Sequence, residues 1–170
     1  MALRFTSILL ALLTTLAPTR SARRDRRIVD VVEAGNARSE LAHGFVGVST
    51  LAGASQGATY RQARGWMRYA LTTFEDTDVT VAFTFVALDS ASNRFDVVVE
   101  DSVIVTRSWS PGSATSPVVE VVVPFALTKG KNNIAVTLRA RDGKTPALRD
   151  VRTIQDHLED RSLHFTGAVR

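Results

Sequence analysis

The 170-residue sequence contains no cysteine, only three histidines and 7% aromatic residues. The absence of cysteine excludes disulfides, thiolate nucleophiles, iron–sulfur clusters and cysteine-liganded zinc. Because three histidines also argue against a histidine-rich metal site, we expect no cofactor and no metal. The chain is too short for a barrel enzyme of about 250 residues. Its 45% hydrophobic and 22% charged residues are typical of one globular domain.

The formal net charge of +4 is concentrated at the N-terminus. Residues 1–27 carry six arginines against Asp25, whereas residues 28–170 hold 15 basic and 16 acidic side chains. In that second part the charges are interspersed, without the basic stripe and interleaved aromatics that are typical of nucleic-acid binding. We therefore expect no nucleic-acid partner.

Residues 1–22 have the layout of a secretory signal peptide. A basic start precedes the apolar run Phe5–Ala17 and the small residues Ser21 and Ala22. The run is shorter than the roughly 20 residues that span a bilayer, so we expect no stable membrane span after signal removal. The prediction is a secreted or periplasmic protein. The basic linker 23–27 disfavours export, which leaves a retained anchor or an organelle transit peptide as alternatives.

The remainder of the chain predicts β-structure throughout. In Val79–Leu88, valine and phenylalanine at odd positions alternate with threonine and alanine at even positions, so one face of a strand is apolar. Eight further strand candidates are Ile28–Val32, Gly44–Thr50, Trp66–Phe74, Phe95–Glu100, Val103–Ser108, Val118–Val123, Asn133–Arg141 and Leu148–Ile154. About nine short strands predict an all-β fold, a two-sheet antiparallel β-sandwich with a jelly-roll-like topology over residues 28–155.

Few segments have helical character. Two short candidates are Asn36–His43 and Asp150–Leu163, and residues 156–170 are expected to form a polar tail. Glu100–Ser102 suits a tight hairpin, and Ser108–Pro117 is predicted to be a long polar loop.

Several residues resemble a known family in their order and spacing. They are Ser39, Glu40 and His43 in S-E-x-x-H, then Gly65–Tyr69, Phe95–Asp101, Val123–Pro124 and Leu127–Lys131. Together they resemble the C-terminal β-sandwich module of secreted glycoside hydrolases of family 127, the β-L-arabinofuranosidase-like proteins. That module is itself a domain of unknown function, and the resemblance covers about residues 28–155.

The chain also departs from that family. The usual G-G-W-F-S-Y segment reads Arg64–Tyr69, and the D-G turn reads Glu100–Asp101. The helical-barrel catalytic domain has no counterpart, and its cysteine-liganded zinc site is impossible without cysteine. The resemblance therefore implies a non-catalytic accessory module standing alone.

The candidate ligand contacts are aromatic and cationic. In a strand, Arg64, Trp66 and Arg68 share one face, where an exposed indole between two guanidinium groups suits stacking on a sugar. The alternative is a core tryptophan, or arginine stems packed on an exposed one. Trp109 heads the polar loop and is expected to be exposed, and Tyr60 is a third aromatic candidate.

Glu40 and His43 lie one turn apart if their segment is helical. They fit either structural bracing or ligand contact, and provide too few ligands for a metal.

Two other motifs suggest chemistry only weakly. Gly53–Gly57 matches G-x-S-x-G around Ser55, but the following residues predict a strand instead of the required helix, so a glycine-rich loop is expected. The acidic residues Glu75, Asp76 and Asp78 are too few for calcium and fit a solvated turn.

We therefore expect an exported, non-catalytic β-sandwich module associated with glycoside hydrolases. It would bind an oligosaccharide or polysaccharide, or dock to a glycoside hydrolase catalytic chain. The alternatives are a structural or protein-interaction module, or a split-gene fragment, with no sugar affinity, and a small hydrolase using Ser55. An aromatic shelf beside polar donors favours glycan binding, whereas a flat apolar patch favours docking.

Overall fold

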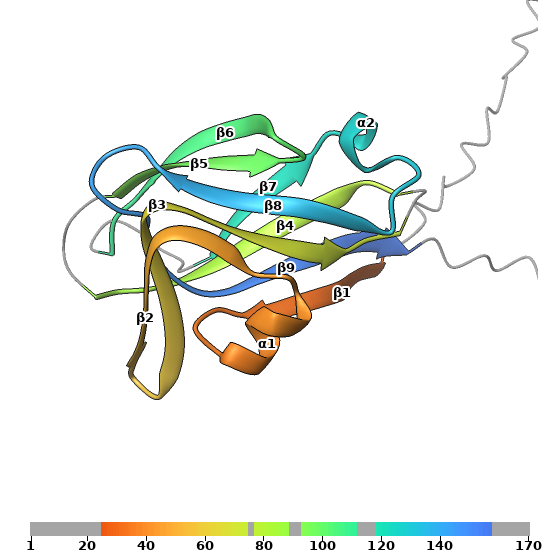
Figure 1. Ribbon diagram of the computed structural model, residues 1–170. Helices are drawn as coiled ribbons and strands as arrows, with labels where there is room; N and C mark the ends of the chain where they lie inside the picture. Colours follow the sequence, from red (N-terminus) through yellow and green to blue (C-terminus); the bar gives the residue numbers. More distant parts are fainter. Residues whose placement is uncertain (1–24, 75–76, 89–92, 112–117, 158–170) are drawn as a thin grey trace, which may run out of the picture.

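The computed structural model describes residues 25–74, 77–88, 93–111 and 118–157. These residues form nine strands and two short helices (Figure 1). The strands are β1 (Asp25–Glu33), β2 (Val46–Ser55), β3 (Ala58–Thr72), β4 (Val79–Val86), β5 (Asn93–Val99), β6 (Ser102–Trp109), β7 (Val118–Val123), β8 (Asn133–Ala140) and β9 (Ala147–His157), and the helices are α1 (Ala37–Ala42) and α2 (Phe125–Thr128).

The strands belong to one continuous antiparallel network that folds into two layers. Its order is β6-β5-β8-β3-β9-β4-β7, with β2 added beside β3 and β1 beside β9. The layers β2-β3-β8-β5-β6 and β1-β9-β4-β7 are joined where Arg61 pairs with Leu148 (Figure 1). Across the interior, Phe85 of the second layer contacts Phe95 and Trp109 of the first, with ring centroids 5.5 and 5.3 Å apart. The predicted sandwich of nine antiparallel strands is confirmed, and its two sheets are continuous at one corner.

Period-two alternation places the core where the sequence predicts it. The odd positions of β4, from Val79 to Phe85, are buried between the layers. The inward residues of β3 and β8 face them, with Met67 and Leu71 on β3 and Leu138 on β8 all buried. The outward positions of these strands are therefore free to carry polar and aromatic groups.

Two hairpins turn on residues with positive φ. Glu100 and Asp101 (φ 50° and 63°) join β5 to β6, and Gln56 and Gly57 (φ 51° and 76°) join β2 to β3. Positive φ at both central residues matches the strand twist in a two-residue hairpin. The hairpin predicted at Glu100–Ser102 is confirmed. The predicted glycine-rich loop at Gly53–Gly57 is wrong in part, because β2 continues to Ser55.

The helix predicted at Asp150–Leu163 is wrong over residues 150–157. That segment lies in β9, where Val151, Thr153 and Gln155 face the core with a period of two. The helix expected within Asn36–His43 is confirmed as α1, and the short helix α2 was not predicted.

The proposed signal peptide at residues 1–22 and nearly all of the tail 156–170 lie outside the described residues. At the N-terminal boundary, β1 begins at Asp25 and includes Arg26 and Arg27, which the sequence assigns to the linker. In the described part of the chain, no helix has the length and apolar character needed to cross a membrane.

Leu148 provides a test of the corner that joins the layers. Its side chain is 0% exposed, so Leu148→Ala should lower the free energy of unfolding by about 2–5 kcal/mol in a urea titration. Leu51→Ala makes the same change at a position that is 64% exposed and should cost less than about 0.5 kcal/mol. Similar losses in the two variants would contradict this description of the core.

Candidate functional site

Glu40 lies at the centre of a buried hydrogen-bond cluster beneath α1. Its carboxylate accepts two bonds from the Arg61 guanidinium, one of them from Nε at 2.7 Å. It also accepts the Gly35 N–H at 2.7 Å and the Tyr69 hydroxyl at 3.3 Å. Burial, followed by the adjacent Glu40 charge, raises the pKa of Tyr69 well above its usual range, so the hydroxyl remains a donor. Both carboxylate oxygens are thus engaged inside the protein.

His43 ties α1 to two strands. Its Nδ1 lies 2.7 Å from the Ser39 carbonyl oxygen, and its Nε2 lies 3.1 Å from Asp30 Oδ1. Asp30 Oδ2 in turn accepts the Thr72 N–H of β3 at 2.8 Å. Burial acts to raise the pKa of Asp30, but the bonds from Thr72 and His43 outweigh it and hold that pKa below its usual range. The S-E-x-x-H segment therefore supplies internal contacts that position α1.

A row of side chains crosses the outer surface of the first layer. Val48, Trp66, Arg139, Asp96 and Thr106 are successive register partners on β2, β3, β8, β5 and β6. Register partners in antiparallel strands point to the same side of the sheet. We use the name Trp66 face for this outer surface, defined by Val46, Val48, Arg64, Trp66, Arg68, Arg94, Asp96, Asp101, Thr106, Thr137, Arg139 and Arg141.

Asp96 holds two arginines of the Trp66 face in place. Its Oδ2 accepts bonds from Arg139 Nη2 and from Arg141 Nε, each at 2.7 Å, and its Oδ1 accepts the Thr106 hydroxyl at 2.7 Å. These groups cover the carboxylate so completely that Asp96 is 0% exposed. Burial acts to raise the pKa of Asp96, but the bonds from Arg141, Arg139 and Thr106 lower it to about 2. The carboxylate is therefore a permanent anion that orients two half-exposed cations.

Arg68 is fixed beside the indole. Its Nε donates to Thr137 Oγ1 at 2.9 Å, and its Nη2 donates to Asp101 Oδ1 at 2.6 Å. The guanidinium carbon lies 5.7 Å from the centroid of the Trp66 ring, within cation–π distance. Trp66 is partly exposed, and Arg64 lies one alternate position along the same strand with an exposed side chain. The structure thus places the predicted Arg64, Trp66 and Arg68 together on the outer surface.

Trp109 is not part of the Trp66 face, and the prediction that its side chain is exposed is wrong. It is the last residue of β6, is 6% exposed and packs against Phe85. Its indole Nε1 is buried with no hydrogen-bond partner in the structure described. Extending the alternation of β6 by one residue beyond Ser108 places Trp109 on the same side as Val105, a signal that sequence reasoning missed.

Tyr60 lies six residues before Trp66 on β3, about 20 Å away at the rise of an extended strand. It pairs with Gly53, and a Cβ built on Gly53 would lie 2.4 Å from the Tyr60 hydroxyl. The ring therefore packs on the β2–β3 hairpin, which only glycine permits at that position.

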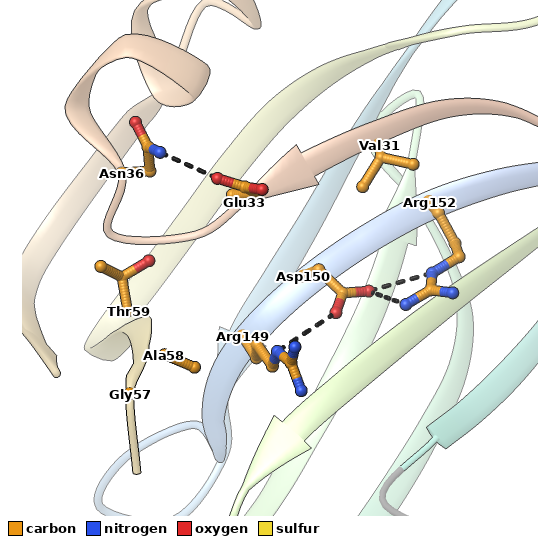
Figure 2. A pocket seen from close by; sticks show the side chains of 9 residues that line it. All are labelled: Val31, Glu33, Asn36, Gly57, Ala58, Thr59, Arg149, Asp150 and Arg152. Atoms are coloured by element: carbon orange, nitrogen blue, oxygen red, sulfur yellow. Dashed lines mark hydrogen bonds and ion pairs between the residues drawn. The ribbon is translucent and has the colours of Figure 1, made fainter. Parts of the chain in front are cut away.

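A polar cleft of about 410 Å³ lies in the opposite layer, between β1, β9 and the β2–β3 hairpin (Figure 2). In Figure 2, Asp150 binds Arg152 and lies 4.0 Å from Arg149, while Glu33 accepts a bond from Asn36. The charges of the two acidic side chains that line the cleft balance those of its two basic side chains. The cleft could not be predicted from local patterns, because its lining combines the β2–β3 hairpin with residues of β9 that are distant in the chain.

Ser55 does not have the local structure that a nucleophile elbow requires. Ser55 ends β2 and is followed by β3, so the strand–turn–helix context of a nucleophile elbow is missing. In the described residues, no group of three or more His, Asp or Glu could hold a metal ion. Glu75 and Asp76 lie outside the described residues.

Sequence reasoning named only Arg64, Trp66 and Arg68 of the Trp66 face and missed its other members, among them Arg94, Asp96, Arg139 and Arg141. Alternation within β5 and β8 indicates that Arg94, Asp96 and Arg139 point outward, and Arg141 directly follows β8. Which outward residues become neighbours depends on the order β3-β8-β5, and local periodicity does not contain that information.

The chain belongs to a family of unknown function, DUF6805, whose model matches residues 24–154. No curated protein matches the sequence. The specific resemblance to the C-terminal module of family 127 glycoside hydrolases is not part of this assignment.

Solved structures share the fold at low sequence identity. A family 35 carbohydrate binding module from Clostridium thermocellum superposes with a TM-score of 0.56 and 8% identity, covering 76% of this chain and 97% of that one. A family 35 module from an environmental isolate gives 0.56 and 20%, covering 75% and 96%. A family GH115 4-O-methyl-α-glucuronidase with specificity for decorated arabinogalactans gives 0.53 and 14%, covering 76% of this chain and 18% of that one. At these identities the likeness establishes a shared fold, the class of sandwich used by carbohydrate-binding modules.

The Glu40 cluster can be tested by removing one partner. Glu40→Ala leaves the largely buried Arg61 guanidinium without its anion and should lower the free energy of unfolding by about 3–5 kcal/mol in urea. The exposed Glu33 is the control, and Glu33→Ala should cost about 0–1 kcal/mol. Equal stability of the two variants would show that the cluster does not brace α1.

The Asp96 site predicts a specific acid dependence. Because folding lowers the pKa of Asp96 from 3.8 to about 2, its contribution to stability is full above pH 3.8 and is lost as the pH falls through about 2. The melting temperature should therefore fall between about pH 4 and 2, in part because Asp96 becomes protonated. In Asp96→Asn that part of the fall should be absent. Asp101→Asn, at a side chain that is 82% exposed, is the control and should retain the fall. An unchanged profile in Asp96→Asn would contradict the prediction.

Proposed function

We propose that this chain is a non-catalytic carbohydrate-binding module whose ligand contacts the Trp66 face. The observation that carries the proposal is the row in which a partly exposed indole stands beside guanidinium groups held by Asp96 and Thr137. A flat aromatic ring packs on the apolar face of a sugar, and guanidinium N–H groups donate to its hydroxyl oxygens.

The groups around Trp66 suit a polysaccharide chain more than an isolated small molecule. Val46 and Val48 are exposed on β2 and extend the apolar strip beside the ring. Arg68 and Arg139 flank the ring on β3 and β8. Together they lie on the outer side of neighbouring strands, along which successive sugar units can lie.

We further propose that the module is exported and works with a glycoside hydrolase catalytic chain. The signal-like residues 1–22 support export. The resemblance to the accessory module of family 127 enzymes, together with a fold shared with carbohydrate-binding modules, supports the association with a hydrolase.

Docking without sugar affinity is the second candidate, and one observation favours it. Ile28, Ile154, Thr80 and Val122 form a row across the outer side of β1, β9, β4 and β7. Ile28 and Val122 are exposed there, as is the neighbouring Val31. An exposed apolar sheet face is typical of a surface that packs against another domain.

Glycan binding is testable with Trp66→Ala. If the indole stacks on a sugar, this change should weaken binding to a glycan found on a glycan array about tenfold, measured by titration calorimetry. Trp66→Phe retains an aromatic plane and should lose less affinity. Phe74→Ala removes an aromatic residue that is 56% exposed outside the Trp66 face and should leave binding unchanged.

Two other results would contradict the proposal. Loss of binding in Arg149→Ala, with Trp66→Ala unaffected, would move the ligand to the cleft of Figure 2 and contradict the assignment to the Trp66 face. Absence of binding to every glycan on the array would reject sugar binding and favour docking.

A further inference from the structure

We infer that the Trp66 face selects anionic polysaccharides, with sugar units that carry carboxylate or sulfate groups. This inference rests on the proposed function, because it takes the Trp66 face as the glycan site. It assigns the chemical class of the ligand from the arrangement of charge on that surface.

The Trp66 face has an excess of positive charge. It holds five arginines, which are Arg64, Arg68, Arg94, Arg139 and Arg141, against only Asp96 and Asp101. Arg139 and Arg141 share the single carboxylate of Asp96, and Asp142 adds a second negative charge close to Arg141. Arg64 and Arg94 are exposed and make no side-chain bond or ion pair within the described residues. Two further cations are therefore available to an incoming anion.

The excess of positive charge is confined to the Trp66 face. Residues 28–170 as a whole hold 15 basic and 16 acidic side chains, so this part of the chain has no net positive charge that would attract polyanions in general. The cleft of the opposite layer shows the contrast, because Glu33 and Asp150 there balance Arg149 and Arg152. A negatively charged polymer is accordingly attracted to one side of the sandwich.

The cations are also pre-oriented. Asp96 binds Arg139 through two nitrogens, at 3.2 and 2.7 Å, and Thr137 holds Arg68 Nε at 2.9 Å. An oriented guanidinium loses less side-chain entropy when it binds an anion, and the N–H groups that Asp96, Thr137 and Asp101 do not use can donate to the oxygens of a carboxylate or sulfate. Because Arg139 pairs with Trp66 across β3 and β8, an anionic group can be bound while its sugar ring lies on the indole.

This combination distinguishes an acidic glycan from other anions. A neutral glycan can stack on Trp66 and accept hydrogen bonds from the arginines, but it gains no attraction between opposite charges. A polyanion without sugar rings gains from the arginines but has no ring to stack on the indole. An acidic glycan uses both, so its affinity should depend on the arginines, on the tryptophan and on salt.

The experiment compares four polymers on the purified full-length protein by titration calorimetry. They are polygalacturonate for carboxylates, dextran sulfate for sulfates, unmodified dextran as the neutral glycan and poly-L-glutamate as the anion without sugar. We expect one of the two anionic glycans to bind at least about tenfold more tightly than dextran and poly-L-glutamate at low salt. Raising NaCl from about 50 to 500 mM should remove most of that preference.

Matched variants locate the effect. Arg64→Glu should weaken binding of the preferred anionic glycan about tenfold and should weaken dextran binding much less, because only the anionic glycan loses an attraction between opposite charges. Arg38→Glu reverses an exposed arginine on α1, away from the Trp66 face, and should change neither. Trp66→Ala should weaken both glycans, because stacking is common to them.

The outcomes separate this inference from the function on which it rests. Equal, Trp66-dependent binding of dextran and both anionic glycans would overturn the anion preference and retain sugar binding. Equally tight binding of poly-L-glutamate, independent of Trp66, would indicate a general polyanion surface and overturn both. Tighter binding of polygalacturonate or of dextran sulfate identifies the anionic group as carboxylate or sulfate, respectively.

Discussion

The structure depends on β3 serving both layers of the sandwich. This strand of 15 residues pairs with β2 and β8 in the first layer, and through Arg61 with Leu148 of β9 in the second. β3 therefore forms the corner at which the sheet passes from the first layer to the second. Because alternate side chains of a strand point to opposite sides, the same strand carries core residues such as Met67 inward and Trp66 outward. The outer site is consequently positioned by the most constrained element of the fold.

That constraint explains how a charge can be buried on the outer side of a sheet. Asp96 would be costly to desolvate alone, but register places Arg139 directly opposite it on β8 and Thr106 opposite it on β6. Arg141, the residue directly after β8, completes the set. The carboxylate is stabilised by groups that backbone pairing brings to it, and in return it holds two cations in fixed positions. The register of the strands thus fixes the positions of the charged side chains on this outer surface.

Elements determined by local patterns could be predicted from the sequence, whereas contacts determined by strand order could not. Each strand of the described residues overlaps a predicted one, although β2 continues beyond the predicted end at Thr50 and β3 begins before the predicted start at Trp66. The turn at Glu100–Asp101 follows from turn chemistry. The helix predicted from Asp150 was wrong because many residues of this segment are polar, so the period-two burial of Val151, Thr153 and Gln155 is not evident from the sequence. Arg64, Trp66 and Arg68 could be grouped because they lie on one strand. Their neighbours Arg139 and Asp96 come from strands that lie far away in the chain, and only the order β3-β8-β5 brings them together.

The two outer surfaces of the sandwich differ in a way that fits a module acting between a polymer and a partner domain. The first layer presents an indole among oriented cations, which is favourable for a charged, hydroxyl-rich chain but costly to bury against a protein without matching anions. The second layer presents Ile28, Val31 and Val122, which gain from exclusion of water and offer little to a sugar. Glycan binding and docking therefore need not compete for one site. Because the core separates the two layers, a ligand on the Trp66 face leaves the apolar surface accessible to a partner.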